Sequence, residues 1–406
     1  MRLLVNQLSA LRQKTGVGHY TEQLCRSFHR HCGADEIEAY PSGPARRAYK
    51  TLARFFPLVG RGASEAARGG RSLRGSAAQH VRRAATTLLT RHFAAVCARR
   101  RYDLYHEPNF IPLPVSCPTV STLHDLSVVR HPEWHPADRV RHFEQELPRA
   151  LEECVHFVTV SEFVRREVIR TLGVAPARVT AVHNGVRSGL RPIAGEVVAR
   201  TLKSLHLPSR YLLHVGTIEP RKNVLMLLRA YCALPSPLRE RWPLLLVGGW
   251  GWGTSSVAAY WHEHARHRGV ILSGYVADRH LAALYSGARA LVYPSLYEGF
   301  GLPPLEMMAC GGAVLASTAG AVVETAGGQA HLISPQDVGA WQLALERVLT
   351  DDDWWQSLRQ GAVEAAAPYT WERCAAATLR VFHSVAGKRA AADLSPGAPS
   401  RYRAAG

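Results

Sequence analysis

Residues 290–306 read ALVYPSLYEGFGLPPLE and combine an apolar run, a loop with two glycines and a proline at which a helix can begin. Proline suits the first turn of a helix because its fixed φ is already helical. The stretch therefore predicts one strand–loop–helix unit, and similar units fill the C-terminal half. The expected strands are 211–216, 244–248, 270–274, 290–294, 313–317 and 331–333, and the expected helices are 224–233, 255–268, 278–286 (with Asp278 as N-cap), 303–310 and 336–349.

Such regular alternation predicts a parallel sheet with helices on both faces. Ligands of these sheets bind beyond the carboxyl ends of the strands. The N-terminal half alternates less regularly, but it also predicts an α/β domain. Its expected strands are 2–8, 102–106, 119–123, 157–160 and 179–182, and its expected helices are 19–30 and 162–172, the second capped by Ser161.

A length of 406 residues favours two domains rather than one core. We expect two Rossmann-like parallel-sheet domains facing across a cleft. The expected division is an N-terminal domain (1–190), a linker (191–209), a second domain (210–368), a C-terminal helix that crosses back to the N-terminal domain (369–388) and a disordered tail (389–406).

The composition, 47% hydrophobic and 20% charged, is typical of a soluble globular protein. The eight cysteines are scattered, which favours reduced thiols in the cytoplasm. Residues 1–8 fit a first strand better than an export segment, and no uncharged apolar stretch approaches the roughly 20 residues needed to span a bilayer. Any membrane contact is therefore expected to be peripheral.

Basic residues outnumber acidic ones, with 49 Lys and Arg against 32 Asp and Glu. Fourteen of the basic residues lie between Arg46 and Arg101, where Glu65 is the single acid. This field favours an anionic partner: a lipid surface, a diphosphate or a nucleic acid. The alternative is an Arg-rich solvated helix. Because no interleaved aromatic residues or nucleic-acid-binding motif accompany the charge, we expect no specific nucleic acid.

Two acids and two cations stand at the expected carboxyl ends of strands. Glu298 lies in the glycine-containing loop and Glu306 in the helix that follows, and a carboxylate can accept hydrogen bonds from a vicinal diol. Arg221 and Lys222 follow the 211–216 strand, and adjacent cations there suit a diphosphate. The alternatives are a water-facing loop acid, an acid near a helix start and a charged surface turn.

The chain resembles glycosyltransferase family 4, the retaining GT-B transferases, especially its bacterial mannosyltransferase-B-like branch. The resemblance covers nearly the whole chain and rests on six elements in the family's order. These are Thr15-Gly16-Val17-Gly18-His19-Tyr20, Leu123-His124-Asp125-Leu126, Val160-Ser161-Glu162, Asn184-Gly185-Val186, Gly216-Thr217-Ile218-Glu219-Pro220-Arg221-Lys222-Asn223 and the Glu298-x7-Glu306 pair.

The resemblance implies that residues 1–190 form the acceptor-side domain and residues 210–368 the nucleotide-sugar-binding domain, and it implies roles for individual residues. Glu298 would contact the donor sugar, Glu306 the ribose, and Arg221 and Lys222 the diphosphate, while His124 would orient the sugar. Asn109 would line the acceptor side, and the base would be read by main-chain atoms around Val276. The implied catalytic residues are His124, Arg221, Lys222 and Glu298, and the implied donor site comprises Gly16, Gly18, Gly216, Arg221, Lys222, Val276, Glu298, Gly299, Phe300, Gly301, Leu302 and Glu306.

The resemblance also implies a reaction: transfer of a hexose, with retention, from a nucleotide sugar to a lipid-diphosphate-linked or oligosaccharide acceptor in surface polysaccharide synthesis. GDP-mannose is the expected donor by branch resemblance, with UDP-, dTDP- or ADP-sugars or a GT-B epimerase as alternatives. No Asp-x-Asp follows a strand, so we expect metal independence and no cofactor, with Arg221 and Lys222 in the place of a cation. The expected location is the cytoplasm, at the inner face of the membrane.

Overall fold

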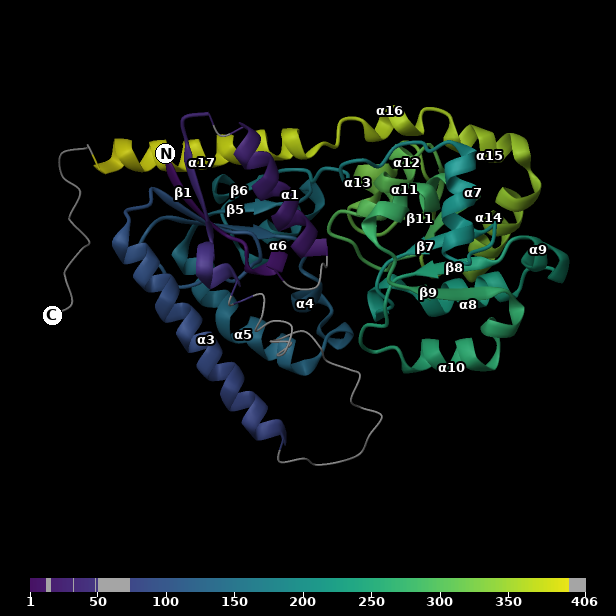
Figure 1. Cartoon of the computed structure of the whole chain (residues 1–406), viewed down its shortest axis with the longest axis horizontal. Coiled ribbons are helices and arrows are strands. Elements are labelled where there is room, and N and C mark those ends of the chain that lie inside the picture. Colours follow the sequence, from purple (N-terminus) through teal and green to yellow (C-terminus); the bar gives the residue numbers. More distant parts are fainter. Residues whose placement is uncertain (12–15, 32, 48, 50–73, 394–406) are drawn as a thin grey trace.

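The computed structural model describes residues 1–11, 16–31, 33–47, 49 and 74–393. They form two six-stranded parallel sheets flanked by helices, side by side along the long axis of the molecule (Figure 1). The expectation of two parallel α/β sheets is therefore confirmed. Every residue of the strand Leu244–Val247 is buried, as a sheet covered on both faces requires.

The N-terminal sheet has the order β2-β1-β3-β4-β5-β6 and the C-terminal sheet the order β12-β11-β10-β7-β8-β9. The first consists of β1 (Arg2–Asn6), β2 (Glu36–Tyr40), β3 (Leu104–Glu107), β4 (Thr119–Leu123), β5 (Cys154–Thr159) and β6 (Val179–Ala181). The second consists of β7 (Leu212–Val215), β8 (Leu244–Val247), β9 (Val270–Gly274), β10 (Ala290–Tyr293), β11 (Ala313–Ser317) and β12 (His331–Ile333).

The direction in which the strand order runs reverses in the middle of each sheet. In the C-terminal sheet the reversal lies between the neighbours β7 and β10, and in the N-terminal sheet it lies between β1 and β3. The loops after the two strands at such a point diverge to opposite faces of the sheet and leave a crevice between them. Each sheet thus supplies one crevice before any side chain is considered.

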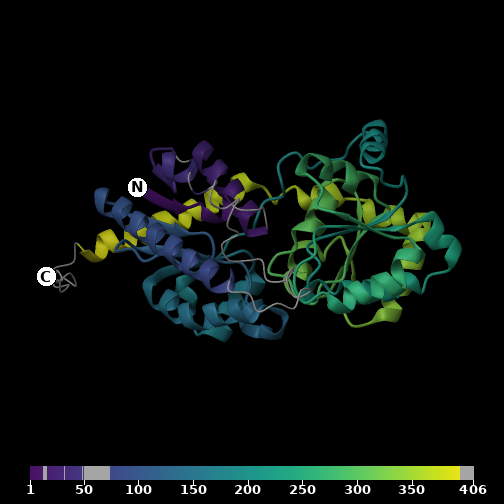
Figure 2. The same ribbon diagram turned by 60° about the horizontal axis from the view of Figure 1, so that its bottom comes forward.

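Helices cover both sheets (Figures 1 and 2). Those of the N-terminal half are α1 (Gly16–His31), α3 (Arg74–Arg99), α4 (Ser127–Arg130), α5 (Ala137–Glu153) and α6 (Glu162–Leu172). Those of the C-terminal half are α7 (Gly195–Ser204), α8 (Val224–Cys232), α9 (Ser236–Arg241), α10 (Ser255–Glu263), α11 (Asp278–Gly287), α12 (Leu302–Ala309), α13 (Val322–Ala326), α14 (Val338–Thr350), α15 (Asp352–Arg359), α16 (Ala362–Ala366) and α17 (Trp371–Asp393).

The last helix, α17, lies along the N-terminal half of the molecule (Figure 1). There the ring of Phe382 packs against the rings of Phe28 and His106. The chain reaches this helix by passing close to Gly185, where an added Cβ would lie 2.3 Å from the backbone nitrogen of Trp371. The Asn184-Gly185 motif therefore lets two backbone segments meet as the chain returns.

Three sequence-based expectations need correction. Residues 195–204, assigned to a linker, form α7, whose Val198 and Leu202 are buried. Asp278 is the first residue of α11 and Ala277 is its N-cap. The helix expected at 255–268 ends at Glu263, and a 3₁₀ turn follows at Ala265–Arg268. Strand β2 and helix α5 were not predicted.

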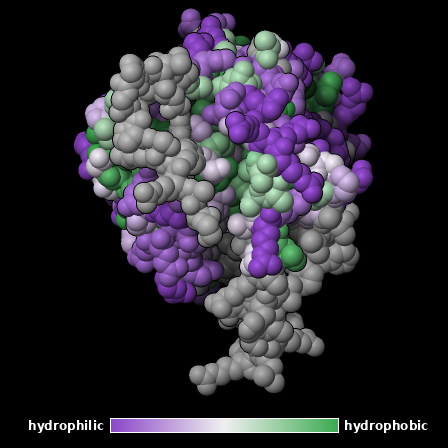
Figure 3. Space-filling model, turned by 90° about the vertical axis from the view of Figure 1, so that its left-hand side faces the viewer, coloured by the Kyte–Doolittle hydropathy of each residue, from purple (hydrophilic) through white to green (hydrophobic). Residues whose placement is uncertain are grey.

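The basic segment 46–101 can be placed only in part. Helix α3 accounts for its C-terminal portion, whereas the mobile stretch expected at 60–75 lies almost wholly outside the described residues, as does the tail from 394 onward. On the end of the molecule formed by the N-terminal domain, hydrophilic residues cover most of the coloured surface (Figure 3). No helix among the described residues is long and apolar enough to cross a bilayer.

Candidate active site

The crevice between β7 and β10 brings Arg221, Lys222 and Glu298 together. The two cations lie in a 3₁₀ turn, Pro220–Lys222, just after β7, and Glu298 lies in the loop after β10. Arg221 Nη1 donates to Glu298 Oε2 at 2.8 Å, and Lys222 Nζ donates to Glu298 Oε1 at 2.5 Å. The two cations and the first acid of the Glu-x7-Glu pair therefore face one another on the same side of the sheet.

The turn that carries the cations is held in place from both sides. Asn223 follows it in the left-handed conformation, and its side-chain amide donates to the carbonyl oxygens of Pro294 and Pro335. The backbone N–H of Leu296 donates to the carbonyl of Arg221 at 2.7 Å. The loops after β7 and β10 are thus fastened to each other, which keeps the cations at a fixed position.

Glu298 is ionised at all ordinary pH values. Burial alone would raise its pKa, but Arg221 and Lys222 outweigh burial and lower the pKa to about 2. Burial lowers the pKa of Lys222, and the adjacent Arg221 charge lowers it further. Lys222 also donates to the Tyr293 hydroxyl at 2.7 Å. The cluster is a buried ion-pair network whose cations already have an anionic partner.

A second acid completes the surroundings of Arg221. Glu219 is buried, and its Oε1 lies 2.7 Å from Arg221 Nε. Asp125, from the N-terminal domain, also contributes to the raised pKa of Arg221; burial opposes the shift, and Glu298, Glu219 and Asp125 outweigh it. Glu219 lies two residues before Arg221, so the sequence alone could have suggested its place beside the cation. The approach of Asp125 to Arg221 depends instead on how the two domains pack.

Glu306 belongs to a neighbouring set of contacts. It is buried in α12, where its Oε2 accepts a hydrogen bond from the Tyr285 hydroxyl at 2.7 Å. Its Oε1 lies 3.1 Å from Arg187 Nε, close enough for an ion pair although not aligned as a hydrogen bond. Arg187 in turn lies 3.9 Å from Asp278. Arg187 had not been singled out, although it directly follows the Asn184-Gly185-Val186 motif.

The loop between the two acids is shaped by close backbone approach. An added Cβ on Gly299 would lie 1.8 Å from the carbonyl oxygen of His124, so this loop touches the N-terminal domain. Gly301 has φ +89° and precedes α12 as its N-cap. Leu302 is the first residue of α12, and the two prolines after it lack N–H groups, so few backbone donors are available at this helix start.

The ring of Phe300 lies in the core rather than in the crevice. It is buried and packs near the rings of His183 and Tyr369. Gly216, at the end of β7, lies beside Lys222, whose Cε would be 3.6 Å from an added Cβ. A donor contact from Phe300 would have to come from its main chain, whereas Gly216 leaves room next to the cation.

The N-terminal domain presents residues of its own to this region. His124 follows β4, and its Nε2 lies 2.7 Å from the carbonyl oxygen of Pro108, so this nitrogen carries the proton and donates. Burial lowers the pKa of His124, which favours a neutral ring. Asn109 is exposed, and its backbone N–H donates to Glu107. The Nδ1 atom of His124 is the ring nitrogen left for a ligand.

Gly16 and Gly18 form the first turn of α1, not the loop before it. The next residue, His19, is buried and has its Nδ1 3.9 Å from Asp278 of the C-terminal domain. The start of α1 therefore approaches the loop between β9 and α11. Backbone N–H groups at a helix start are favourable for an anion, which is compatible with the phosphate-facing role expected of these glycines.

Direct contacts hold the two domains together around the crevice. The Tyr297 hydroxyl donates to Glu167 of α6 and accepts from the backbone N–H of Leu126. Glu324 of α13 accepts hydrogen bonds from the backbone N–H groups of Glu162 and Phe163, both at 2.8 Å. The carboxylate of one domain thus caps a helix of the other, and the domains are closed on each other.

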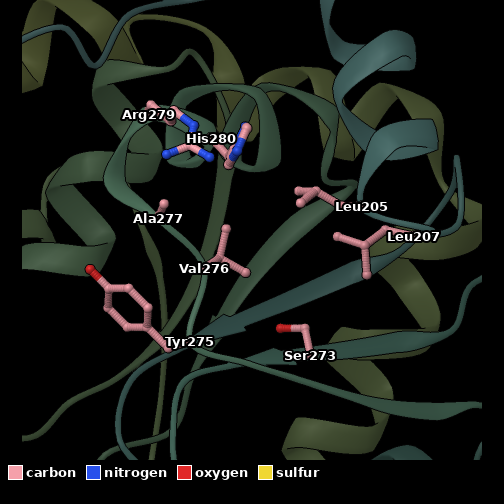
Figure 4. Close-up of a pocket in the computed structure, with 8 residues that line it drawn as sticks. All are labelled: Leu205, Leu207, Ser273, Tyr275, Val276, Ala277, Arg279 and His280. Carbon is pink, nitrogen blue, oxygen red and sulfur yellow. The ribbon is translucent and has the colours of Figure 1, made fainter.

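A cavity of about 250 Å³ lies beside the loop between β9 and α11. Figure 4 shows Leu205 and Leu207 to the right of Val276, with Arg279 and His280 above it. The remaining lining residues are Ser273, Tyr275 and Ala277. The cavity surrounds the expected base-reading position at Val276. Its two leucines come from the segment that had been interpreted as a linker, so sequence reasoning missed them.

Two parallel sheets with a charged crevice at the switch point of one of them are the architecture of GT-B sugar transferases. A family model described as "Glycosyl transferases group 1" matches residues 203–367, and one described as "Glycosyltransferase Family 4" matches residues 15–189. The chain is 36% identical to the O-antigen chain mannosyltransferase B of Escherichia coli over 281 residues, which cover 69% of this chain and 74% of that protein. The chain therefore belongs to glycosyltransferase family 4.

Further similarities agree with this assignment. The serotype-specific mannosyltransferase WbdA of Escherichia coli is 30% identical over 269 residues, which span 33% of that longer protein. Among solved structures, Anabaena HepE in complex with UDP and glucose superposes with a TM-score of 0.68 at 17% identity, covering 95% of this chain and 100% of that one. WaaG, a glycosyltransferase involved in lipopolysaccharide biosynthesis, has a TM-score of 0.65 at 15% identity, covering 98% and 100%. These two structures establish the shared fold.

Proposed function

We propose that this glycosyltransferase transfers mannose, with retention of configuration, from GDP-mannose to a saccharide acceptor carried on a lipid diphosphate in surface polysaccharide synthesis. The observation that carries the proposal is the contact of Arg221 and Lys222 with Glu298 at the switch point. The mannose and polysaccharide parts rest on the similarity to O-antigen mannosyltransferases.

The donor would lie along the crevice in an extended pose. The base would enter the cavity around Val276, between the leucines of the α7 end and the first turn of α11. The ribose would contact Glu306, and the diphosphate would reach Arg221 and Lys222, with the start of α1 on its other side. His124 and Glu298 would then face the sugar. Residues from both domains contribute, which is why the closed arrangement matters for activity.

The chemistry of transfer needs charge stabilisation at the leaving group. As the bond from the anomeric carbon to the phosphate oxygen breaks, that oxygen keeps the electron pair, and Arg221 and Lys222 stabilise the negative charge. The acceptor hydroxyl attacks the same face of the sugar and passes its proton to the departing phosphate. Retention by this route requires no covalent carboxylate intermediate.

Metal independence is part of the proposal. Among the described residues, no group of three or more His, Cys, Asp or Glu side chains is placed to hold a metal ion. Arg221 and Lys222 would take the role of a divalent cation once the donor diphosphate replaces Glu298 as their partner. We also propose that the enzyme works at the inner face of the cytoplasmic membrane, because its acceptor is attached to a lipid.

Thermal-shift measurements with GDP, UDP, dTDP and ADP test the donor. A ligand that binds only the folded protein raises its melting temperature. At a ligand concentration of one hundred times Kd, it stabilises the folded protein by about 2.7 kcal/mol. We expect the largest shift with GDP. A larger shift with another nucleotide would change the base assigned to the donor but leave the assignment as a transferase intact. Release of free nucleoside diphosphate without an acceptor would favour an epimerase.

A variant tests the role of the cations. Arg221→Ala should reduce transfer at least a hundredfold, since removing one donor to developing charge commonly has an effect of this size. Arg229→Ala, on the helix that follows the turn, is the matched control and should retain activity. Wild-type turnover in Arg221→Ala would refute the role assigned to this side chain.

A further inference from the structure

A second cavity, of about 450 Å³, lies at the opposite edge of the C-terminal sheet. Three of its residues lie one or two positions before strands: Arg210 before β7, Trp242 before β8 and Arg289 before β10. It therefore lies at the amino ends of the strands, whereas Arg221 lies at a carboxyl end. A four-residue strand spans about 13 Å, so this edge cavity is separate from the candidate active site. Its other lining residues are Leu238, Arg241, Leu349, Thr350 and Asp352.

Three guanidinium groups surround one indole in the edge cavity. The guanidinium carbons of Arg210, Arg241 and Arg289 lie 5.7, 5.9 and 5.4 Å from the ring centroid of Trp242. Cation–π attraction compensates part of the repulsion among like charges. Among the described residues that line the cavity, Asp352 carries the single carboxylate against three arginines, so this lining has a net charge of two positive units.

The three arginines differ in exposure and in the hydrogen bonds and ion pairs that their side chains form. Arg289 is buried and already has partners. Its Nε donates to the carbonyl oxygen of Val348 at 2.7 Å, and its Nη2 donates to Asp352 at 2.5 Å. Arg210 and Arg241 are exposed, and neither side chain forms an ion pair or hydrogen bond with any described residue. Two guanidinium groups thus remain available to a ligand at the mouth of the cavity.

The wall contains the indole of Trp242 and two apolar side chains. The indole Nε1–H of Trp242 is buried and has no hydrogen-bond partner among the described residues. Leu238 and Leu349 line the same space. The cavity therefore combines oxygen-seeking groups with a nonpolar wall.

The arginines could instead stabilise the helices near them, because cations interact favourably with the carboxyl end of the helix dipole. That explanation covers Arg241 only weakly, since α9 has six residues, and it does not cover Arg210, which lies outside any helix. The volume of the cavity also falls within the range of about 300–1,000 Å³ typical of ligand sites.

We propose that the edge cavity binds a phosphate-bearing group, with Arg210 and Arg241 donating to its oxygens and the Trp242 ring and the leucines contacting its nonpolar part. Guanidinium forks match phosphate oxygens in pairs. The phosphate could belong to an anionic lipid headgroup, which would hold the enzyme at a membrane, or to a soluble phosphorylated compound. The inference does not depend on the proposed donor.

Charge reversal at the two exposed arginines tests the proposal. Arg210→Glu/Arg241→Glu is compared with wild type and with the control Arg166→Glu/Arg200→Glu, which changes the charge equally at exposed positions elsewhere. One arm measures co-sedimentation with phosphatidylglycerol vesicles, with phosphatidylcholine vesicles as reference. The other titrates inorganic pyrophosphate and follows the indole N–H resonance of Trp242, assigned with Trp242→Phe.

We expect the cavity variant to lose affinity at least tenfold in one arm or both, while the control behaves as wild type. Loss with vesicles alone identifies a lipid headgroup, and loss of the Trp242 response to pyrophosphate identifies a soluble phosphate compound. Any pyrophosphate bound at the donor site is common to all variants, so it does not affect the comparison. Retention of wild-type binding by the cavity variant in both arms, or absence of binding by wild type in both, would overturn the proposal.

Discussion

Glu298 pairs with the two cations that a donor diphosphate would need, so the carboxylate and the diphosphate compete for Arg221 and Lys222. This competition can be measured. Glu298→Gln keeps the size of the side chain but removes its charge, leaving Arg221 and Lys222 without that anion. The pKa of about 2 compares with an ordinary 4.5, and at about 1.4 kcal/mol per pH unit the difference is worth about 3 kcal/mol. Because burial opposes this shift, the figure is a net value, and it sets the scale of the possible gain in nucleoside diphosphate affinity at about a hundredfold.

We expect a gain of about tenfold for GDP, because Glu219 still pairs with Arg221 in the variant. Without ligand the variant should be less stable, since removing one partner of a buried ion pair commonly costs about 3–5 kcal/mol. Transfer should fall because the sugar hydroxyls lose a charged acceptor. Isothermal titration calorimetry gives the affinity, and thermal unfolding with and without GDP gives the stability.

The matched control is Glu219→Gln, in which the amide oxygen can still accept from Arg221 Nε. It should change GDP affinity less than Glu298→Gln does. A carboxyl whose pKa is lowered by folding stabilises the folded protein above the pKa it has when unfolded, and this stabilisation is lost only as the pH falls toward 2. Neither result should therefore vary between pH 6 and 8. Unchanged or weaker GDP binding by Glu298→Gln would show that the carboxylate and the diphosphate do not compete.

Three other changes have defined outcomes. Gly299→Ala places a Cβ 1.8 Å from the carbonyl of His124, so it should separate the domains locally and lower both transfer and melting temperature. Tyr297→Phe removes the hydroxyl that bonds Glu167 across the domains and should cost about 1–3 kcal/mol in thermal unfolding. Burial raises the pKa of Glu107 to about 7, so the folded protein holds this proton more tightly than the unfolded chain does. The free energy of unfolding should therefore fall by roughly 3 kcal/mol as pH rises from 4.5 to 7, and Glu107→Gln should flatten that dependence in denaturant titrations.

Controls make these outcomes specific. Gly249→Ala, where an added Cβ meets nothing within 4 Å, should leave melting and transfer near wild type. Equal effects of the two glycine substitutions would mean that backbone contact with His124 is not the cause. A melting temperature unchanged by Tyr297→Phe would contradict its role between the domains. An identical pH slope in wild type and Glu107→Gln would show that another group is responsible.

Periodicity and local chemistry were sufficient for the order of strands and helices in the C-terminal half. All six strands expected in that half are present, because short apolar runs between turn residues suit strands that are covered on both faces. The cations after β7 and the acid after β10 were also visible as residues at strand ends. Local signals were weaker in the N-terminal half, where β2 is only partly buried and alternation is irregular.

The contact of Arg221 and Lys222 with Glu298 joins residues that are 77 and 76 positions apart, and it exists because β7 and β10 are neighbours. Strand adjacency depends on how the whole sheet packs, and a sequence pattern does not encode it locally. The same holds for the cavity walls from Leu205 and Leu207, and for the three arginines that meet at Trp242. Local patterns were enough for the elements and for the residues at their ends, whereas long-range packing determined which of those ends meet.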